Sequence, residues 1–150
     1  MDGTDVANIL HRETIAMIVG GKTFERGEQC FVAGRVLGVD SRAGELAGIV
    51  RPVETSRAPY EVRIWVRDDG LAYECTCPVG TARQFCKHAV AIALAHLQKE
   101  NQRAERELAE LRVELMNVSM SALLDTLVQH ARLDRTLLDA LKAIVERARR

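Results

Sequence analysis

Residues 75–88 read CTCPVGTARQFCKH. Three of the four cysteines in the chain lie within this stretch, and a histidine closes it. The spacing is Cys-x-Cys, then eight residues, then Cys-x-His. The residues before it alternate as in a β-strand, and those after it contain neither glycine nor proline, as in a long helix. We therefore interpret the stretch as a zinc site that joins a sheet to a helix.

The four side chains of this pattern form a complete ligand set for zinc. Structural zinc is bound by four tetrahedral ligands, drawn from thiolate sulfur and imidazole nitrogen. Side chains two residues apart on a regular helix diverge by about 200°, so the third cysteine must lie at or before the helix N-terminus. Four protein ligands leave no position for water, which predicts one structural Zn²⁺ and no catalysis at the metal. The predicted ligands are Cys75, Cys77, Cys86 and His88.

Three alternatives compete with the zinc site. In the first alternative, the cysteines are buried free thiols and His88 is an ordinary histidine at a helix start. In the second, the Cys-x-Cys pair is a redox pair, which leaves Cys86 and His88 unexplained. The third makes Cys86 and His88 a nucleophile and its base, although on a helix they would not face each other. The cysteines cluster with Pro78 and Gly80 in a turn, and this favours the metal.

Composition limits the class of protein. The 150 residues contain 21 Lys and Arg against 21 Asp and Glu, so the formal net charge is zero. This balance argues against a generally basic nucleic-acid binder. The chain opens without a basic segment leading into an apolar one, and no apolar run approaches about 20 residues. We therefore expect a cytoplasmic protein without a membrane segment, in which reduced cysteines bind metal.

The part of the chain before the cysteines is typical of a small antiparallel sheet. Residues 60–67 alternate between apolar and polar side chains, which predicts a strand with one face on a core. Asp69-Gly70 predicts a hairpin turn, since a two-residue turn needs positive φ. Further strands are expected at 29–39, 46–53 and 71–76, with a turn at 41–44. Before them we expect a helix at 4–18 capped by Thr4, ended by Gly20-Gly21, and a connector at 23–27.

The part after the cysteines is typical of helices alone. One long helix is predicted from residue 88 to about residue 115, and shorter helices at 120–131 and after the capping residue Asp134. Apolar residues at spacings of three and four form a heptad seam over 94–118, with Asn101 at an a position. This seam either forms a homodimeric coiled coil or packs on the two following helices as an intramolecular bundle, which we favour. The predicted fold is α+β: an antiparallel meander of about four strands, the Cys-x-Cys…Cys-x-His turn, a long helix and two short helices.

Four short motifs resemble the sequence around the zinc finger of the SWIM family, in particular of its small prokaryotic members. They are Phe24-Glu25-Arg26-Gly27, Gly34-Arg35-Val36, Pro59-Tyr60-Glu61-Val62 and Cys86-Lys87-His88-Ala89. The resemblance covers roughly residues 14–98, and residues 119–145 look like the helical tail of some members. One departure is Cys30, where an aromatic residue is expected; we interpret Cys30 as a core or edge residue and not as a ligand. The corresponding domains are an N-terminal helix at 1–22, a SWIM-like zinc module at 23–98 and a helical tail at 99–150.

This resemblance implies a module that binds proteins or DNA and contributes to another machine. SWIM modules occur with DNA-processing ATPases, transposases and recombination accessory proteins. No Gly-Lys-Ser/Thr phosphate loop is present, so ATPase or helicase activity is expected in a separate partner. The function we expect is a non-catalytic zinc-binding adaptor that docks a protein partner and touches DNA. The alternative is direct nucleic-acid binding in recombination, repair or transcription.

Two sets of residues are candidates for the contact surface. Arg83, Gln84, Phe85 and Lys87 lie on or beside the zinc turn, with an inward-packed Phe85 as the alternative. Arg63, Trp65 and Arg67 share one face of a strand, where an aromatic residue between two arginines suits phosphate contact and base stacking. The same pattern suits a sheet face covered by the N-terminal helix, which we favour.

Overall fold

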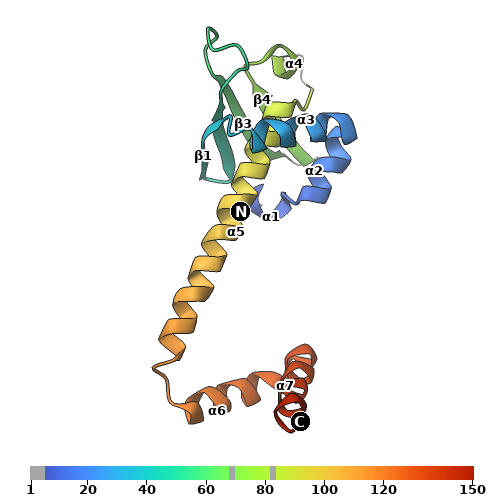
Figure 1. Cartoon of the computed structure of the whole chain (residues 1–150). Coiled ribbons are helices and arrows are strands. Elements are labelled where there is room, and N and C mark those ends of the chain that lie inside the picture. The colour runs from blue at the N-terminus through green and yellow to red at the C-terminus, as the bar shows by residue number, and fades with distance from the viewer. Residues whose placement is uncertain (1–5, 68–69, 82–83) are drawn as a thin grey trace. The chain divides into compact units, whose positions relative to one another are not determined.

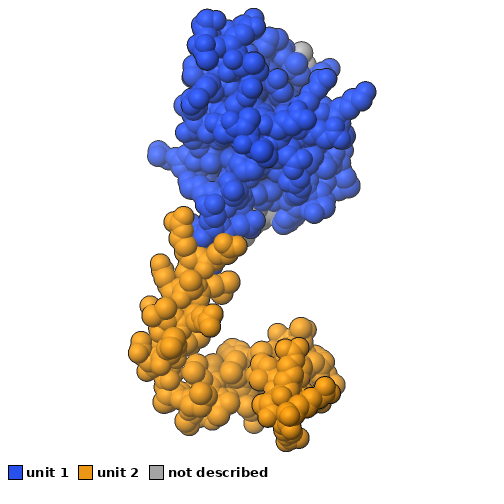
Figure 2. Space-filling view, in the orientation of Figure 1, with its two compact units in different colours: residues 1–104 blue, residues 105–150 orange. Residues whose placement is uncertain are grey.

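The computed structural model describes residues 6–67, 70–81 and 84–150. The chain divides into two compact units, residues 1–104 and residues 105–150 (Figure 2). The first unit contains a four-stranded antiparallel sheet, and both units contain helices (Figure 1). The structure confirms the predicted α+β class, with a long helix directly after the cysteines. The predicted domain boundaries stay a prediction.

The sheet is a simple meander in the order β1-β2-β3-β4. Its strands are β1 (Val36–Arg42), β2 (Glu45–Val50), β3 (Tyr60–Arg67) and β4 (Gly70–Cys75). Ala43 and Gly44 form the β1–β2 turn with φ of 51° and 77°, as a two-residue turn between twisted strands requires. Of the predicted Asp69-Gly70 turn, Asp69 lies outside the described residues. Strand β4 ends at Cys75, so the sheet delivers the first cysteine of the cluster.

The N-terminal region differs from the prediction. It forms three helices, α1 (Val6–Ile9), α2 (Arg12–Val19) and α3 (Gly21–Val32), where one helix, a connector and the start of a strand were expected. The predictions of a connector at 23–27 and of a strand that begins at residue 29 are therefore wrong. The predicted cap Thr4 lies outside the described residues. Packing makes residues 21–32 helical, because Phe24, Gly27 and Cys30 are buried at helical spacing on α3.

Helix α5 (Lys87–Leu115) is the centre of the first unit. Its residues from His88 to Leu94 are all buried, so this helix has no exposed side at its start. The reason is contact on two sides. Val90 lies against Gly27 of α3, and Ile92 lies against Gly48 of β2. Figure 1 shows the start of α5 between the sheet and the N-terminal helices. No helix among the described residues is long and apolar enough to cross a membrane.

The second unit contains the end of α5, α6 (Met120–Ala131) and α7 (Arg135–Ala148). Among the described residues of this unit only Ala131 is buried. Leucines of the predicted heptad seam are exposed, among them Leu108 at 66% and Leu111 at 47%. The favoured intramolecular bundle over this seam is therefore absent from the described unit. A homodimer through the seam stays a prediction.

The start of α7 depends on one side chain. Asp134 Oδ1 accepts hydrogen bonds from the backbone N–H groups of Thr136 (2.8 Å) and Leu137 (3.2 Å). Replacing this N-cap with alanine should cost about 1 kcal/mol of helix stability. We expect Asp134→Ala to speed amide hydrogen exchange over the first turn of α7, with Glu146→Ala, at an exposed position near the other end of the same helix, as the control. Equal exchange in both variants would show that the cap is unimportant.

Candidate metal centre

The four residues predicted to bind zinc come together at the junction between the sheet and α5. Cys75 is the last residue of β4, and Cys77 lies between β4 and the short helix α4 (Pro78–Thr81). Cys86 directly precedes α5, as predicted, and His88 is the second residue of that helix. All four side chains are buried, and their ligand atoms lie within 4.8 Å of one another.

The separations of these atoms suit a tetrahedral ion. His88 Nδ1 lies 3.8 Å from Cys75 Sγ and 3.9 Å from Cys86 Sγ. Bonds of about 2.3 Å to sulfur and about 2.0 Å to nitrogen place the corners of a zinc tetrahedron roughly 3.5–3.8 Å apart. The donor set, its burial and its spacing therefore fit Zn²⁺. When bound, the ion would hold β4, the turn and α5 together through bonds from each of them.

Gly80 allows the turn to close over the cluster. A Cβ at this position would lie 2.4 Å from Cys75 Cβ and 2.5 Å from the Cys75 carbonyl oxygen. Because a carbonyl cannot swing aside as a side chain does, any larger residue would push the turn away from β4. The Gly80 N–H also donates a hydrogen bond to Cys77 Sγ at 3.2 Å. Gly80 thus donates a hydrogen bond to the sulfur of Cys77 and lies close to the backbone of Cys75.

The thiols of Cys75 and Cys86 interact strongly. A hydrogen bond from Cys75, followed by one from His88, lowers the pKa of Cys86 to about 4. Backbone N–H groups at Ala89 and His88 add to this effect, so the Cys86 sulfur accepts hydrogen bonds at the start of α5. The same thiol pair, together with burial, raises the pKa of Cys75. A divalent cation at this site would remove the repulsion between two thiolates.

Aromatic rings surround the histidine and the turn. The ring of Tyr60 stacks on His88 with centroids 4.5 Å apart, which fixes the plane of the imidazole. Phe85 packs against Tyr73 at the same centroid distance and is half-buried. The alternative of an inward-packed Phe85 therefore describes the structure better than an exposed contact residue. Gln84 is exposed, whereas Arg83 lies outside the described residues.

The second predicted contact set is on the sheet. The prediction that the N-terminal helix covers this face is wrong, because Arg63 and Arg67 are exposed and Trp65 is half-buried. These three residues line an open groove of about 940 Å³ over β3, β4 and α4. Lys87 lines a different cavity, so the two predicted sets do not share one pocket.

The charge on this sheet face is partly neutralised. Arg63 donates through Nε and a terminal nitrogen to both carboxylate oxygens of Glu45, at 2.5 and 2.8 Å. It also lies 3.9 Å from a carboxylate oxygen of Glu74. These contacts raise the pKa of Arg63 and lower that of Glu45, mainly through their mutual hydrogen bond. Arg63 is therefore committed to carboxylates of its own sheet.

Comparison with known proteins agrees with the geometry. The family model of the SWIM zinc finger matches residues 60–97, which include β3, β4, the four clustered residues and the start of α5. Residues 60–97 are therefore similar to a SWIM zinc finger. Neither the curated proteins nor the solved structures contain a match to the chain. The upstream motifs at 24–27 and 34–36 lie outside the matched residues.

The SWIM finger and its cluster fit one structural zinc ion. Sequence reasoning found the four clustered residues because Cys and His in two close pairs are rare. It did not find the packing of Tyr60 on His88 or the role of Gly80. A tyrosine on a core-facing strand and a glycine in a turn are common in proteins that bind no metal, so neither stands out before the fold is known.

Proposed function

We propose that this chain is a non-catalytic adaptor of the cytoplasm: zinc stabilises the SWIM finger, and the α6–α7 helices dock a protein partner. The finger is a zinc-binding module in which four buried donors would fill the coordination shell. A site of this kind supplies structure and leaves binding to other surfaces. The proposal rests on one observation above all, the exposed apolar groove of the second unit.

This groove lies between α6 and α7. Its volume is about 520 Å³, and Val128 of α6 and Leu138, Leu141 and Val145 of α7 line it. Val128 and Val145 are at least half exposed, at 54% and 50%. Apolar stripes on helices need a covering surface, and an amphipathic helix in a groove is a common way to provide one.

Charge at the edge of the groove indicates the kind of helix that fits. Arg132, Lys142 and Arg149 line it together with a single acidic residue, Glu146. A partner with complementary potential would carry Asp or Glu beside its apolar face. We therefore infer an acidic amphipathic helix of another protein as the ligand. The SWIM resemblance makes a DNA-processing ATPase or helicase the first class of partner to examine.

Direct DNA binding has weaker support. Zero net charge and the commitment of Arg63 to Glu45 both reduce the attraction of this sheet for phosphates. If DNA affinity mattered, it would fall steeply as salt increased, because phosphate contacts release counterions. We expect no measurable affinity for duplex DNA at physiological salt. Salt-dependent anisotropy of a labelled duplex measures it.

The groove is tested with two variants of the full chain. Leu141→Glu puts a charge into the groove, whereas Ala140→Glu puts the same charge on the neighbouring exposed position. Proteins captured by the wild type are identified, purified and titrated against all three chains. We expect a purified partner to bind the wild type and Ala140→Glu alike, and Leu141→Glu at least about tenfold more weakly.

Two outcomes contradict the proposal. Equal binding to Leu141→Glu and Ala140→Glu would separate the groove from partner recognition. A wild-type dimer that becomes monomeric in Leu141→Glu, as measured by light scattering after size-exclusion chromatography, would make a second copy of this chain the occupant.

A further inference from the structure

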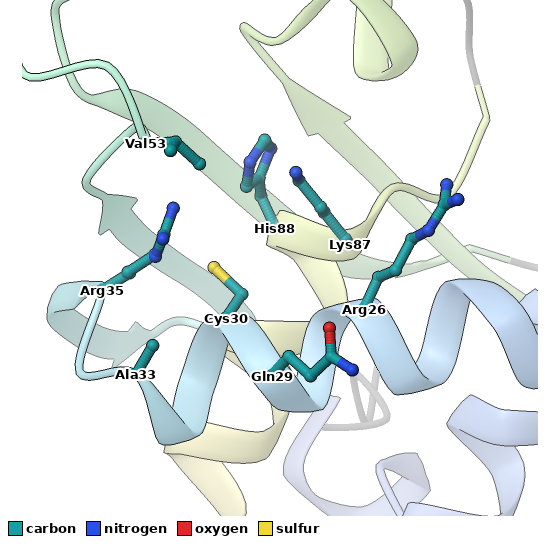
Figure 3. A pocket seen from close by; sticks show the side chains of 8 residues that line it. All are labelled: Arg26, Gln29, Cys30, Ala33, Arg35, Val53, Lys87 and His88. Carbon is teal, nitrogen blue, oxygen red and sulfur yellow. The ribbon is translucent and has the colours of Figure 1, made fainter.

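A second cavity lies beside the zinc finger, between α3 and the start of α5. Its volume is about 420 Å³, and it is lined by residues of both helices and of the segments next to the sheet. Arg26, Arg35 and Lys87 contribute three positive charges, and none of the described residues that line it is acidic. Figure 3 shows the charged ends of these three side chains pointing to the same side of α3. This concentration of charge is unexpected in a chain with zero net charge.

These three cations lack carboxylate partners in the part of the chain that the structure describes. Within residues 6–67, 70–81 and 84–150, no carboxylate forms an ion pair with Arg26, Arg35 or Lys87. Arg63, by contrast, has two carboxylate partners. Side chains of Arg35 and Lys87 are half-buried, so water screens them less than it screens a fully exposed charge. An unpaired, partly buried group of cations is a site for an anion.

Two of these charges line the same cavity as the buried thiol of Cys30. Arg35 and Lys87 both stabilise the charged form of Cys30, although burial dominates and raises the pKa of this thiol. In Figure 3 the sulfur of Cys30 lies between α3 and the side chains of Arg35 and His88. Positive potential from two different elements, one at the end of α3 and one at the start of α5, therefore meets inside the cavity.

A charge balance indicates the kind of anion. Arg35 and Lys87 offer two positive charges to the cavity, and in Figure 3 the end of Lys87 lies between those of Arg35 and Arg26. The guanidinium group of Arg26 therefore lies beyond Lys87, away from Arg35. A phosphate monoester carries about −1.5 to −2 charges at neutral pH and accepts paired hydrogen bonds from guanidinium groups. A single carboxylate would leave positive charge unbalanced.

The size of the cavity favours a small molecule. A volume of about 420 Å³ lies in the usual range for small-ligand pockets, roughly 300–1,000 Å³. Space remains beside a phosphate group, and Ala33 and Val53 offer apolar surface there. We propose that the cavity binds a small organic phosphate monoester, such as a nucleoside monophosphate, through Arg35 and Lys87.

The proposal is tested by calorimetry on the zinc-loaded full chain with AMP, adenosine and inorganic phosphate as probes. We expect AMP to bind, adenosine not to bind, and inorganic phosphate to bind more weakly than AMP. Arg35→Gln and Lys87→Gln should each weaken AMP binding at least about tenfold. Arg67→Gln, which removes an exposed arginine from a different groove, should leave it unchanged. Zinc content and the unfolding midpoint of each variant confirm that it is folded.

Four results would overturn the proposal. These are no binding of AMP, equal binding of AMP and adenosine, equal binding of AMP and inorganic phosphate, and AMP binding that is unchanged in Arg35→Gln and Lys87→Gln. A 5′-phosphorylated oligonucleotide that binds more tightly than AMP, and depends on Arg35, would assign the cavity to a DNA end instead. Leu141→Glu is expected to bind AMP normally, because Leu141 lines a different groove. The AMP proposal and the adaptor proposal can therefore fail independently of each other.

Discussion

Cys86→Ser is expected to abolish stoichiometric zinc binding and to unfold the finger, although serine preserves the cap of α5. Serine is a preferred N-cap residue, so its hydroxyl can accept the backbone hydrogen bonds that the Cys86 sulfur accepts at His88 and Ala89. What is lost is the thiolate. Cys86→Ser therefore removes a metal ligand but keeps a helix cap. An alanine substitution would remove both.

The expected loss is large because the metal would bind residues of β4, the zinc turn and α5 at the same time. Structural zinc contributes about 10–16 kcal/mol to apparent folding in small fingers, comparable to or more than the total stability of about 5–15 kcal/mol of a typical domain. Cys75, Cys77 and His88 should behave in the same way. The helices α1–α3 and the apolar core around Ile64 and Ile92 provide stability of their own, so collapsed structure can persist without cooperative unfolding.

Cys30 supplies the control for this experiment. Cys30 is buried on α3 and is the cysteine that does not belong to the metal cluster. Elemental analysis should find one zinc per chain in the wild type and in Cys30→Ala, and less than a tenth of that in Cys86→Ser, about the loss expected for removing one of four ligands. Hydrogen exchange should show lost protection in β4 and the first turns of α5 only in Cys86→Ser. A folded, metal-free wild type that a chelator leaves unchanged would refute the zinc site.

The sequence allowed prediction of the elements whose local pattern and tertiary environment agree. Strand β3 alternates with period two and was predicted at its observed bounds, and α6 was predicted equally well. The junction at the cysteines followed from metal chemistry, since four donors in two pairs restrict where the strand ends and the helix begins. In β3 and α6 the local sequence pattern favours the same structure as the tertiary packing, and at the cysteines metal binding favours one arrangement.

Helix α3 could not be predicted in the same way because its local pattern conflicts with its environment. Two glycines, Gly21 and Gly27, disfavour a helix by about 1 kcal/mol each, and Cys30, Phe31 and Val32 are good strand residues. The helical spacing of Phe24, Gly27 and Cys30 was present in the sequence, but glycine reads as a break before its contact is known. The anion cavity was missed for a related reason, since Arg26 and Arg35 come together with Lys87 only after α3 is folded.

Gly27→Val tests whether close packing on α5 makes α3 helical, and we expect it to destabilise the first unit by about 3 kcal/mol or more. A Cβ at residue 27 would lie 2.4 Å from both Cβ and Cγ1 of Val90 and 3.0 Å from the Lys87 carbonyl oxygen. Val90 Cβ is bonded directly to the backbone of α5 and cannot rotate away, so α3 and α5 must separate. At roughly 4–8 °C per kcal/mol for a unit of about 100 residues, the midpoint of thermal unfolding should fall by about 12–24 °C.

Gly21 is the matched control because it lies on the same helix with open space around it. No atom lies within 4 Å of a Cβ built on Gly21, and its φ is not positive. Gly21→Ala should therefore leave stability unchanged or raise it by up to about 1 kcal/mol, because alanine favours a helix. Gly27→Ala has the same propensity gain but meets Val90, so a net loss of about 1–2 kcal/mol is expected. If Gly21→Ala and Gly27→Ala shift the midpoint equally, helix propensity rather than the contact with α5 governs residue 27, and close packing cannot be why α3 forms against its local pattern.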